Sequence, residues 1–167
     1  MKEKAYQKLS TIRTKYGIYY VEGNHDLLAN EVEEGFSQKG IQVLADKEIL
    51  INDEFYLVGR KDKRREKLGT PRMELKDLLN NLSNYPIILV DHQPVDQKLA
   101  SSLNVNLHLS GHTHAGQIFP LNFMMQYGYY KKGNYHSIVS SGYGAWGFPF
   151  RTAGRSEMVL IQIKKEK

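Results

Sequence analysis

The chain has 167 residues, enough for one domain with a hydrophobic core. It has no cysteine, which excludes disulfides and thiolate metal sites, so any metal must use nitrogen and oxygen ligands. The net charge of +5 suits an anionic substrate or a solvated surface. No apolar run reaches the roughly 20 residues of a membrane span, and residues 1–17 lack the apolar core of a secretory signal. We therefore expect a cytoplasmic or peripheral membrane location.

Helices and strands alternate over the first two thirds of the chain. Apolar residues at helical spacing predict helices over residues 2–15, 30–39, 70–82 and 95–102. Short β-branched and apolar runs predict strands over residues 18–21, 41–44, 47–51, 55–59, 86–90 and 107–110. The last third is aromatic and rich in glycine and predicts mainly strands, including residues 138–141 and 157–163. This order predicts one domain over residues 1–167, a layered α/β fold in which two sheets pack and helices cover the outside.

Polar side chains of metal-binding type follow three of the predicted strands. They are Asn24-His25-Asp26, His92, and His112-Thr113-His114. Side chains two apart in an extended segment lie on the same side, so both imidazoles of the last group can face one point. Because the carboxyl ends of parallel strands lie on one edge of a sheet, the three groups should converge. Imidazole nitrogens suit Zn, Fe, Mn, Ni or Cu, so the sequence predicts a shared metal site.

These residues occur in blocks: Gly23-Asn24-His25-Asp26, a lone His92, and Gly111-His112-Thr113-His114. The blocks resemble the last three motifs of the calcineurin-like metallophosphoesterase family. The surrounding segments, such as SSGYGAWGFPFR, are similar to a bacterial subgroup that includes membrane-associated phosphoesterases. The resemblance implies an α/β/β/α sandwich that hydrolyses phosphate monoesters or diesters with two divalent ions, Mn, Fe or Zn.

The resemblance also implies residue roles. Asn24, His92 and His112 would bind one metal, and His114 would bind the other. His25 would face the phosphate and protonate the leaving oxygen, and Asp26 would hold the His25 imidazole. Two cations about 3.5–4 Å apart neutralise a phosphate ester, and a water between them becomes hydroxide near neutral pH.

Two earlier family motifs, Asp-x-His and Gly-Asp-x-x-Asp, are absent from residues 1–16, and the central strands that carry them would be missing from the first sheet. The four candidate ligands are all neutral, so a dinuclear site would hold about four uncompensated positive charges and no bridging carboxylate. Asp91 should point away from His92 and cannot substitute. We expect at most a partial, one-metal site and impaired activity in this chain alone. Truncation, self-association by swapping, or a separate N-terminal segment would each explain this pattern.

Other functions remain as alternatives. One is a degenerate, non-catalytic binding module with at most one metal, and another is a phosphodiesterase directed at nucleic acid. Residues 60–72 hold seven basic and two acidic side chains, interpreted as a solvated, mobile loop or as a contact for lipid headgroups. No stacking platform accompanies this segment, which disfavours nucleic acid as a partner. Arg151 is a candidate substrate contact, and His108 and Gln117 are interpreted as structural.

Overall fold

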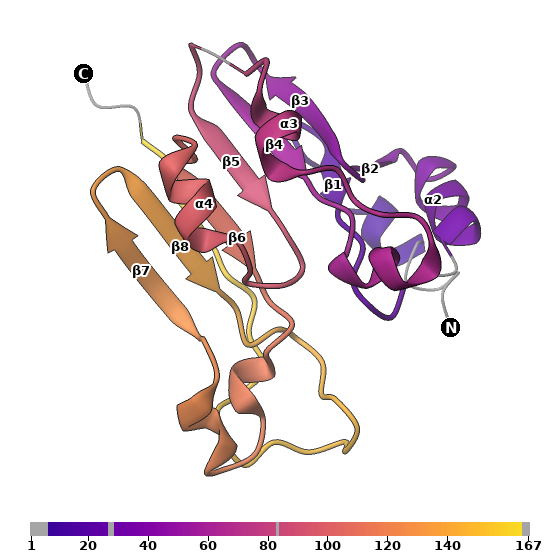
Figure 1. Ribbon diagram of the computed structural model, residues 1–167. Coiled ribbons are helices and arrows are strands. Elements are labelled where there is room, and N and C mark those ends of the chain that lie inside the picture. The colour runs from indigo at the N-terminus through magenta and orange to yellow at the C-terminus, as the bar shows by residue number, and fades with distance from the viewer. Residues whose placement is uncertain (1–6, 27–28, 83, 165–167) are drawn as a thin grey trace.

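A mixed sheet of six strands, in the order β3-β4-β5-β6-β8-β7, forms most of the computed structural model (Figure 1), which describes residues 7–26, 29–82 and 84–164. The four central strands run parallel and the two edge strands run antiparallel to their neighbours. Their bounds are β3 (Lys47–Ile51), β4 (Phe55–Gly59), β5 (Ile87–Val90), β6 (Leu107–Ser110), β7 (Gly128–Lys132) and β8 (Tyr135–Val139). The loops after β5 and β6 therefore leave the same edge of the sheet.

A second, smaller sheet consists of β1 (Ile18–Tyr20) and β2 (Ile41–Val43), which pair in parallel and are joined through α2 (Ala29–Ser37). Phe36 of α2 and Ile41 are buried together, and the Phe36 ring lies 4.1 Å from the ring of Tyr20. The two sheets meet where β4 ends. A side chain at Gly59 would overlap Leu44 and Val21, so glycine permits this close approach.

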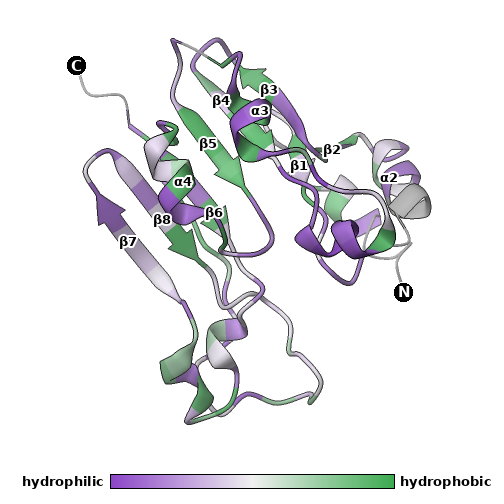
Figure 2. Cartoon of the chain, viewed as in Figure 1, coloured by the Kyte–Doolittle hydropathy of each residue, from purple (hydrophilic) through white to green (hydrophobic). Residues whose placement is uncertain are grey.

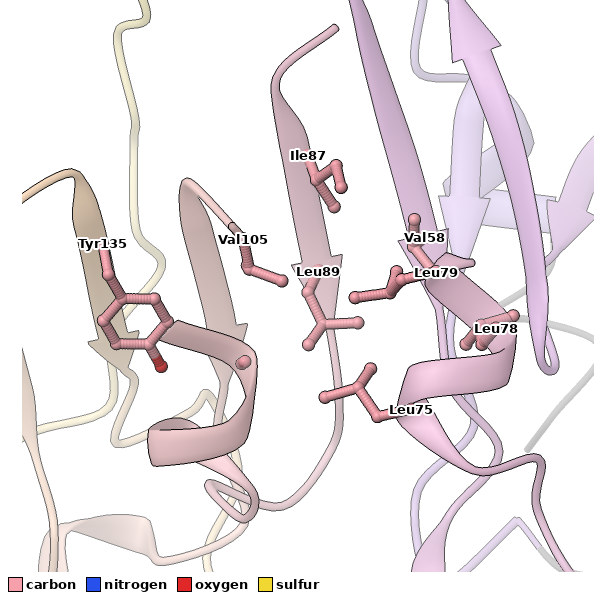
Figure 3. Packing of buried hydrophobic residues seen from close by; sticks show 9 residues of the cluster. Val58, Leu75, Leu78, Leu79, Ile87, Leu89, Val105 and Tyr135 are labelled. Atoms are coloured by element: carbon pink, nitrogen blue, oxygen red, sulfur yellow. The ribbon is translucent and has the colours of Figure 1, made fainter. Parts of the chain in front are cut away.

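The main core lies between the large sheet and two short helices, α3 (Leu75–Leu79) and α4 (Gln97–Ser102) (Figure 3). Its buried members are Val58, Leu75, Leu78, Leu79, Ile87, Leu89, Ala100, Val105 and Tyr135. Each fully buried Leu or Val contributes about 1.5–3 kcal/mol relative to exposure. Figure 2 shows β5 as continuously hydrophobic, and Ile87, Ile88 and Leu89 are all buried, as expected for a strand covered on both faces. This core fixes the strands that carry the candidate site.

The α/β class with two sheets is confirmed, and the 47–51 and 55–59 hairpin has the predicted bounds. Two predicted helices are shorter than expected. The helix predicted over 2–15 is helical at residues 7–10 and ends by Thr11, and residues 1–6 lie outside the described chain. The helix predicted from residue 70 begins at Leu75, because Glu74 before it is extended (ψ 137°), and the Met73 N–H donates to Asp46 Oδ2 (2.8 Å) outside the helix.

The strand predicted over residues 157–163 is wrong. That segment has no assigned strand, and Met158 and Leu160 are 89% and 97% exposed. An alternating pattern favours a strand only where a neighbouring strand is available for pairing, and residues 157–163 pair with none of the described strands. The sequence also predicted that the three site-bearing strands share one sheet. This is wrong, because β1 belongs to the smaller sheet.

Among the described helices, none is long and apolar enough to cross a membrane.

Candidate metal centre

Three loops bring Asn24, His92 and His112 together. Asn24 follows β1, His92 follows β5, and His112 follows β6. His92 Nε2 lies 2.7 Å from Asn24 Oδ1 and 3.0 Å from His112 Nδ1, and His112 Nδ1 lies 3.2 Å from Asn24 Oδ1. Three polar atoms from residues 20 to 88 positions apart thus form a small triangle of hydrogen-bond contacts.

Short-range contacts shape the Asn24 loop. Asp26 Oδ2 accepts hydrogen bonds from the Tyr20 hydroxyl (2.6 Å) and from the Gly23 N–H (2.8 Å). Gly23 itself lies against the His92 ring, where an added Cβ would come within 3.0 Å of Nδ1 and Cε1. Glycine at this position lets the loop approach His92 closely.

The turn after β6 places its two histidines apart. His112 and His114 have φ of 67° and 51°, in the left-handed region, so they are not the extended pair that the sequence predicted. His114 Nδ1 lies 3.3 Å from the Gly144 carbonyl oxygen and 3.2 Å from Arg151 Nη2. In this structure His114 contacts the glycine-rich loop, while His112 joins the triangle. Left-handed backbone at non-glycine residues costs about 1–3 kcal/mol each and is common at functional sites.

Burial favours the neutral form of two histidines in this region, His92 and His114. Burial is the main cause that lowers the pKa of His92, and the nearby His112 lowers it further. Burial also lowers the pKa of His114. Imidazoles that are neutral at neutral pH keep a lone pair for a metal.

The triangle fits one divalent cation. Ligand atoms at about 2.1 Å from a metal and at right angles to each other lie about 3.0 Å apart, as these three do within a few tenths of an ångström. Two nitrogens and an amide oxygen suit Zn, Mn or Fe. Within the described ranges, no group of three His, Cys, Asp or Glu side chains is arranged to hold a metal. Asn24, His92 and His112 are thus candidate ligands for one cation, and none of the three is a carboxylate that could bridge a second.

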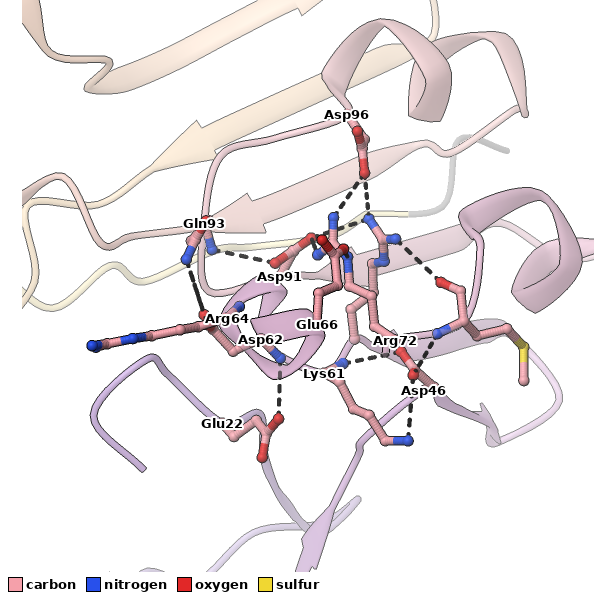
Figure 4. A network of polar contacts seen from close by, with 12 residues as sticks. Glu22, Asp46, Lys61, Asp62, Arg64, Glu66, Arg72, Asp91, Gln93 and Asp96 are labelled. Atoms are coloured by element: carbon pink, nitrogen blue, oxygen red, sulfur yellow. Dashed lines mark hydrogen bonds and ion pairs between the residues drawn. The ribbon is translucent and has the colours of Figure 1, made fainter. Parts of the chain in front are cut away.

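Two buried carboxylates that the sequence did not single out, Glu22 and Asp62, belong to a polar network next to the loops of the triangle (Figure 4). Glu22 and Asp62 are 4% and 0% exposed. Glu22 accepts hydrogen bonds from Arg65 Nε (2.9 Å), from Arg65 Nη2 (2.6 Å) and from the Asp62 N–H (3.1 Å). Gln93 Nε2 donates to Asp62 Oδ2 at 3.3 Å. This network joins the loop that carries Asn24 to the loop that carries His92. The position of Asp62, soon after β4 at the same sheet edge, was a usable signal.

The basic segment 60–72 is only in part the solvated loop that we predicted, because residues 63, 64 and 66–71 are exposed but Arg60, Asp62 and Arg72 are buried. It contains a 3-10 helix, Lys63–Leu68, and its flanking Arg60 and Arg72 are 2% and 9% exposed. Arg72 Nη1 and Arg60 Nη1 lie 2.9 and 3.3 Å from Asp91 Oδ2. Both guanidinium groups also bond to Asp96, at 2.7 Å from Arg60 and 2.9 Å from Arg72. The charges of Arg60 and Arg72 are compensated by Asp91 and Asp96, which are distant in sequence. Composition alone does not reveal such pairs.

Burial is the largest influence on the pKa values of Asp91 and Asp96. It raises the pKa of Asp91, against the opposing charges of Arg72 and Arg60. For Asp96 the same arginines outweigh burial and lower the pKa below its usual value. Asp91 is fully buried in this ion-pair cluster and bonds to Arg60 and Arg72. This agrees with the prediction that Asp91 points away from His92.

The remaining predicted site residues have other partners. Arg151 bonds to the carbonyl oxygens of His114 (3.4 Å), Ser141 (2.7 Å) and Gly144, so it ties the glycine-rich loop to the turn after β6. Its guanidinium is thus occupied by backbone, which argues against the predicted substrate contact. His25 is exposed. Among the described residues, no hydrogen bond joins it to Asp26, whose carboxylate braces Gly23 and Tyr20 instead.

An α/β fold with imidazoles clustered at strand ends is an arrangement that could hold a metal ion. The chain belongs to the calcineurin-like phosphoesterase family, whose model matches residues 2–116. A "Transmembrane protein with metallophosphoesterase domain" from Danio rerio is 34% identical over 96% of this chain and 42% of its own length. An "Uncharacterized metallophosphoesterase" from Helicobacter pylori (strain J99) is 32% identical over 93% of this chain and 45% of its own length. The chain thus spans less than half the length of these two relatives.

A relative from Aquifex aeolicus (strain VF5), also named as an uncharacterized metallophosphoesterase, is 29% identical over 95% of this chain and 65% of its own length. One solved crystal structure is similar with a TM-score of 0.56 and 12% identity, over 82% of this chain and 61% of that chain. This structural likeness supports the fold.

Proposed function

We propose that the chain contributes to metal-dependent hydrolysis of phosphate esters, with Asn24, His92 and His112 holding one divalent cation. The observation that supports this most directly is the triangle of Asn24 Oδ1, His92 Nε2 and His112 Nδ1, with sides of 2.7–3.2 Å. A bound cation at such a site polarises a phosphoryl oxygen and lowers the pKa of a coordinated water. Mn, Fe and Zn are the candidates that match the donor atoms.

The chain's own side chains have separate roles in this proposal. Exposed His25 adjoins Asn24 and would donate a proton to the leaving oxygen of a phosphate ester. His114, held near the triangle by Gly144 and Arg151, would bind a second metal after a change of its contacts. Glu22, Asp62 and Arg65 act behind the site by fixing the two loops.

A second metal needs anionic ligands. The candidate ligands Asn24, His92 and His112 include no carboxylate. The nearby carboxylates of Glu22 and Asp62 are already bonded to Arg65 and Gln93. We propose that carboxylates reach the site from another polypeptide segment, in the same or a second molecule. In the absence of these carboxylates, the chain would bind one metal and hydrolyse esters slowly or not at all.

The test measures metal binding and hydrolysis separately. Titration calorimetry with Mn²⁺ or Zn²⁺ should give one ion per chain, and His92→Ala or His112→Ala should weaken binding by at least about tenfold. His136→Gln is the matched control, because His136 lies on β8 and bonds to Tyr129 (2.7 Å) instead of the triangle. Hydrolysis of p-nitrophenyl phosphate and of its bis ester would then separate monoesterase from diesterase activity.

The results discriminate between an enzyme and a binding module. Metal-dependent hydrolysis that disappears in His92→Ala supports the phosphoesterase. One bound metal without hydrolysis, even when the protein is concentrated enough to self-associate, favours a non-catalytic metal-binding module. Binding that His92→Ala and His136→Gln weaken equally would contradict the triangle as the metal site.

A further inference from the structure

A polar pocket lies at the end of the large sheet opposite the candidate metal centre. Its volume is about 280 Å³, close to the lower limit of about 300 Å³ for small-molecule sites. The candidate metal centre follows the carboxyl ends of β1, β5 and β6, whereas this pocket lies at the amino ends of β6 and β8. The polar side chains that line it come from α4, the loop before β6 and the β7–β8 hairpin: Ser101, Asn104, Asn106, Lys132 and Asn134. The two sites are therefore separate.

The inner wall of the pocket is held by the main core. Tyr135 and Val105 line the pocket and are 3% and 2% exposed (Figure 3). Asn106 Oδ1 accepts a hydrogen bond from the Ile87 N–H at 2.8 Å, and the Asn106 carbonyl oxygen accepts one from the His136 N–H at 2.8 Å. Asn106 is thus fixed between β5 and β8, and its carboxamide Nδ2 remains as a donor.

The other polar side chains of the pocket are available to a ligand. In the part of the chain that the structure describes, no hydrogen bond or ion pair joins the side chains of Ser101, Asn104, Lys132 or Asn134 to another residue. They offer an ammonium group, carboxamides and a hydroxyl, in which N–H and O–H donors outnumber acceptors. A ligand with several acceptor oxygens matches this set.

The charge at the pocket is positive. Lys132 is the charged member of its lining, and β6, β7, β8 and α4 carry no Asp or Glu. Glu157 bonds to Ser140, beyond the other end of β8. Asp53 and Glu54 lie in the turn after β3, and β4 and β5 separate that turn from β6. An ammonium group among neutral donors, with no carboxylate in the lining, suits an oxyanion.

We propose that this pocket binds a phosphate group, either free inorganic phosphate or the phosphate of a small ester. Lys132 Nζ and the carboxamides of Asn104 and Asn134 donate to the phosphate oxygens, and the Ser101 hydroxyl and Asn106 Nδ2 are further donors. The volume of the pocket admits a small ester such as glycerol phosphate and excludes a polymer. This inference goes beyond the proposed hydrolysis, because it uses neither the triangle nor a metal.

The test is an NMR titration of the full, ¹⁵N-labelled chain in EDTA, at constant ionic strength. Sodium phosphate should cause saturable shifts at the amides of Asn104, Lys132 and Asn134, with a Kd of about 1 mM, and the same shifts should appear in His92→Ala. Glycerol phosphate that binds more tightly than inorganic phosphate would identify the ester as the ligand, and equal affinities would identify the free anion. Shifts that do not saturate by about 50 mM phosphate, or that sodium chloride reproduces, would overturn the proposal.

Two neighbouring lysines provide a matched pair of variants. Lys132 lies opposite Tyr135 in the β7–β8 register and Lys131 lies opposite His136, so the two side chains leave opposite faces of the sheet. Both variants, Lys132→Gln and Lys131→Gln, remove the same charge from an exposed position of one strand. Lys132→Gln should weaken phosphate binding by at least about tenfold, because a charge-assisted hydrogen bond is lost, and Lys131→Gln should change it less than about twofold. Equal weakening in the two variants would contradict a site in this pocket and indicate a general effect of net charge.

Discussion

Gly23 controls how closely the Asn24 loop approaches His92. A Cβ at this position would lie 3.0 Å from His92 Nδ1, so the ring must shift by a few tenths of an ångström. We expect Gly23→Ala to weaken Mn²⁺ or Zn²⁺ binding by about tenfold, with a loss of about 1 kcal/mol in unfolding free energy. Calorimetry and urea unfolding measure the two effects. Gly144→Ala is the control, because a Cβ there meets no atom within 4 Å, and an equal effect on metal binding would refute the steric explanation.

His108 is a buried base whose protonation opposes folding. Burial lowers its pKa from 6.5 to about 4, and its Nδ1 lies 3.0 Å from the Tyr135 hydroxyl. Between pH 6.5 and 4 the unfolded chain binds this proton and the folded chain does not. Stability should therefore fall as the pH falls through this range, by up to about 3 kcal/mol from this group.

Urea unfolding at several pH values measures that contribution. His108→Gln removes the titrating group, so the free-energy difference between wild type and variant should shrink as the pH falls from 6.5 to 4. His136→Gln serves as a control because His136 is only partly buried. A difference that stays constant with pH would mean that His108 does not contribute in this way.

At the scale of elements, charged side chains join the loop after β1 to the segment after β4. Glu22 is 6% exposed in its side chain and accepts two hydrogen bonds from Arg65. Glu22→Gln leaves the Arg65 charge unpaired, so we expect a loss of about 2–4 kcal/mol in unfolding free energy. Metal affinity should fall as well, because Glu22 is two residues from Asn24.

The comparison for Glu22→Gln is an exposed ion pair. Lys47 and Glu33 lie 3.7 Å apart with side chains 59% and 49% exposed. Lys47→Gln should change stability by less than about 0.5 kcal/mol and leave metal affinity unchanged. If Glu22→Gln behaves like Lys47→Gln in calorimetry and urea unfolding, the buried network does not position the site.

Local sequence patterns predicted the strands and the hairpin, because these elements depend mainly on residues that are close in sequence. The β3–β4 hairpin and β5 follow from alternation and apolar runs, and the approach of His92 to His112 follows from the rule that parallel strands end at one edge. Asn24 joins them from the smaller sheet, which that rule does not cover. Ion pairs between distant residues were not visible. Arg72 and Asp91 are 19 positions apart and Arg65 and Glu22 are 43 apart, so the sequence does not predict that Arg65 and Arg72 are paired with carboxylates. The separation of His112 from His114 also escaped prediction, because it depends on left-handed backbone.

At the scale of the whole molecule, the candidate metal centre joins two sheets. Asn24 follows a strand of the β1–β2 sheet, whereas His92 and His112 follow strands of the large sheet. The pair β1–β2 has only three residues in each strand, and its buried core cluster holds Phe36 and Ile41. Local opening of this small unit should require less free energy than opening of the large sheet.

A metal held by all three side chains should therefore stabilise the small sheet most. At a concentration 100 times its Kd, a ligand that binds only the folded state adds about 2.7 kcal/mol of stability. We expect Zn²⁺ or Mn²⁺ to slow amide hydrogen exchange in β1 and β2 by up to about 100-fold, while β5 and β6 change less because they open mainly with global unfolding. His92→Ala should abolish the effect and His136→Gln should retain it. Equal protection of every strand would indicate that the metal stabilises the fold globally and does not connect the two sheets through Asn24.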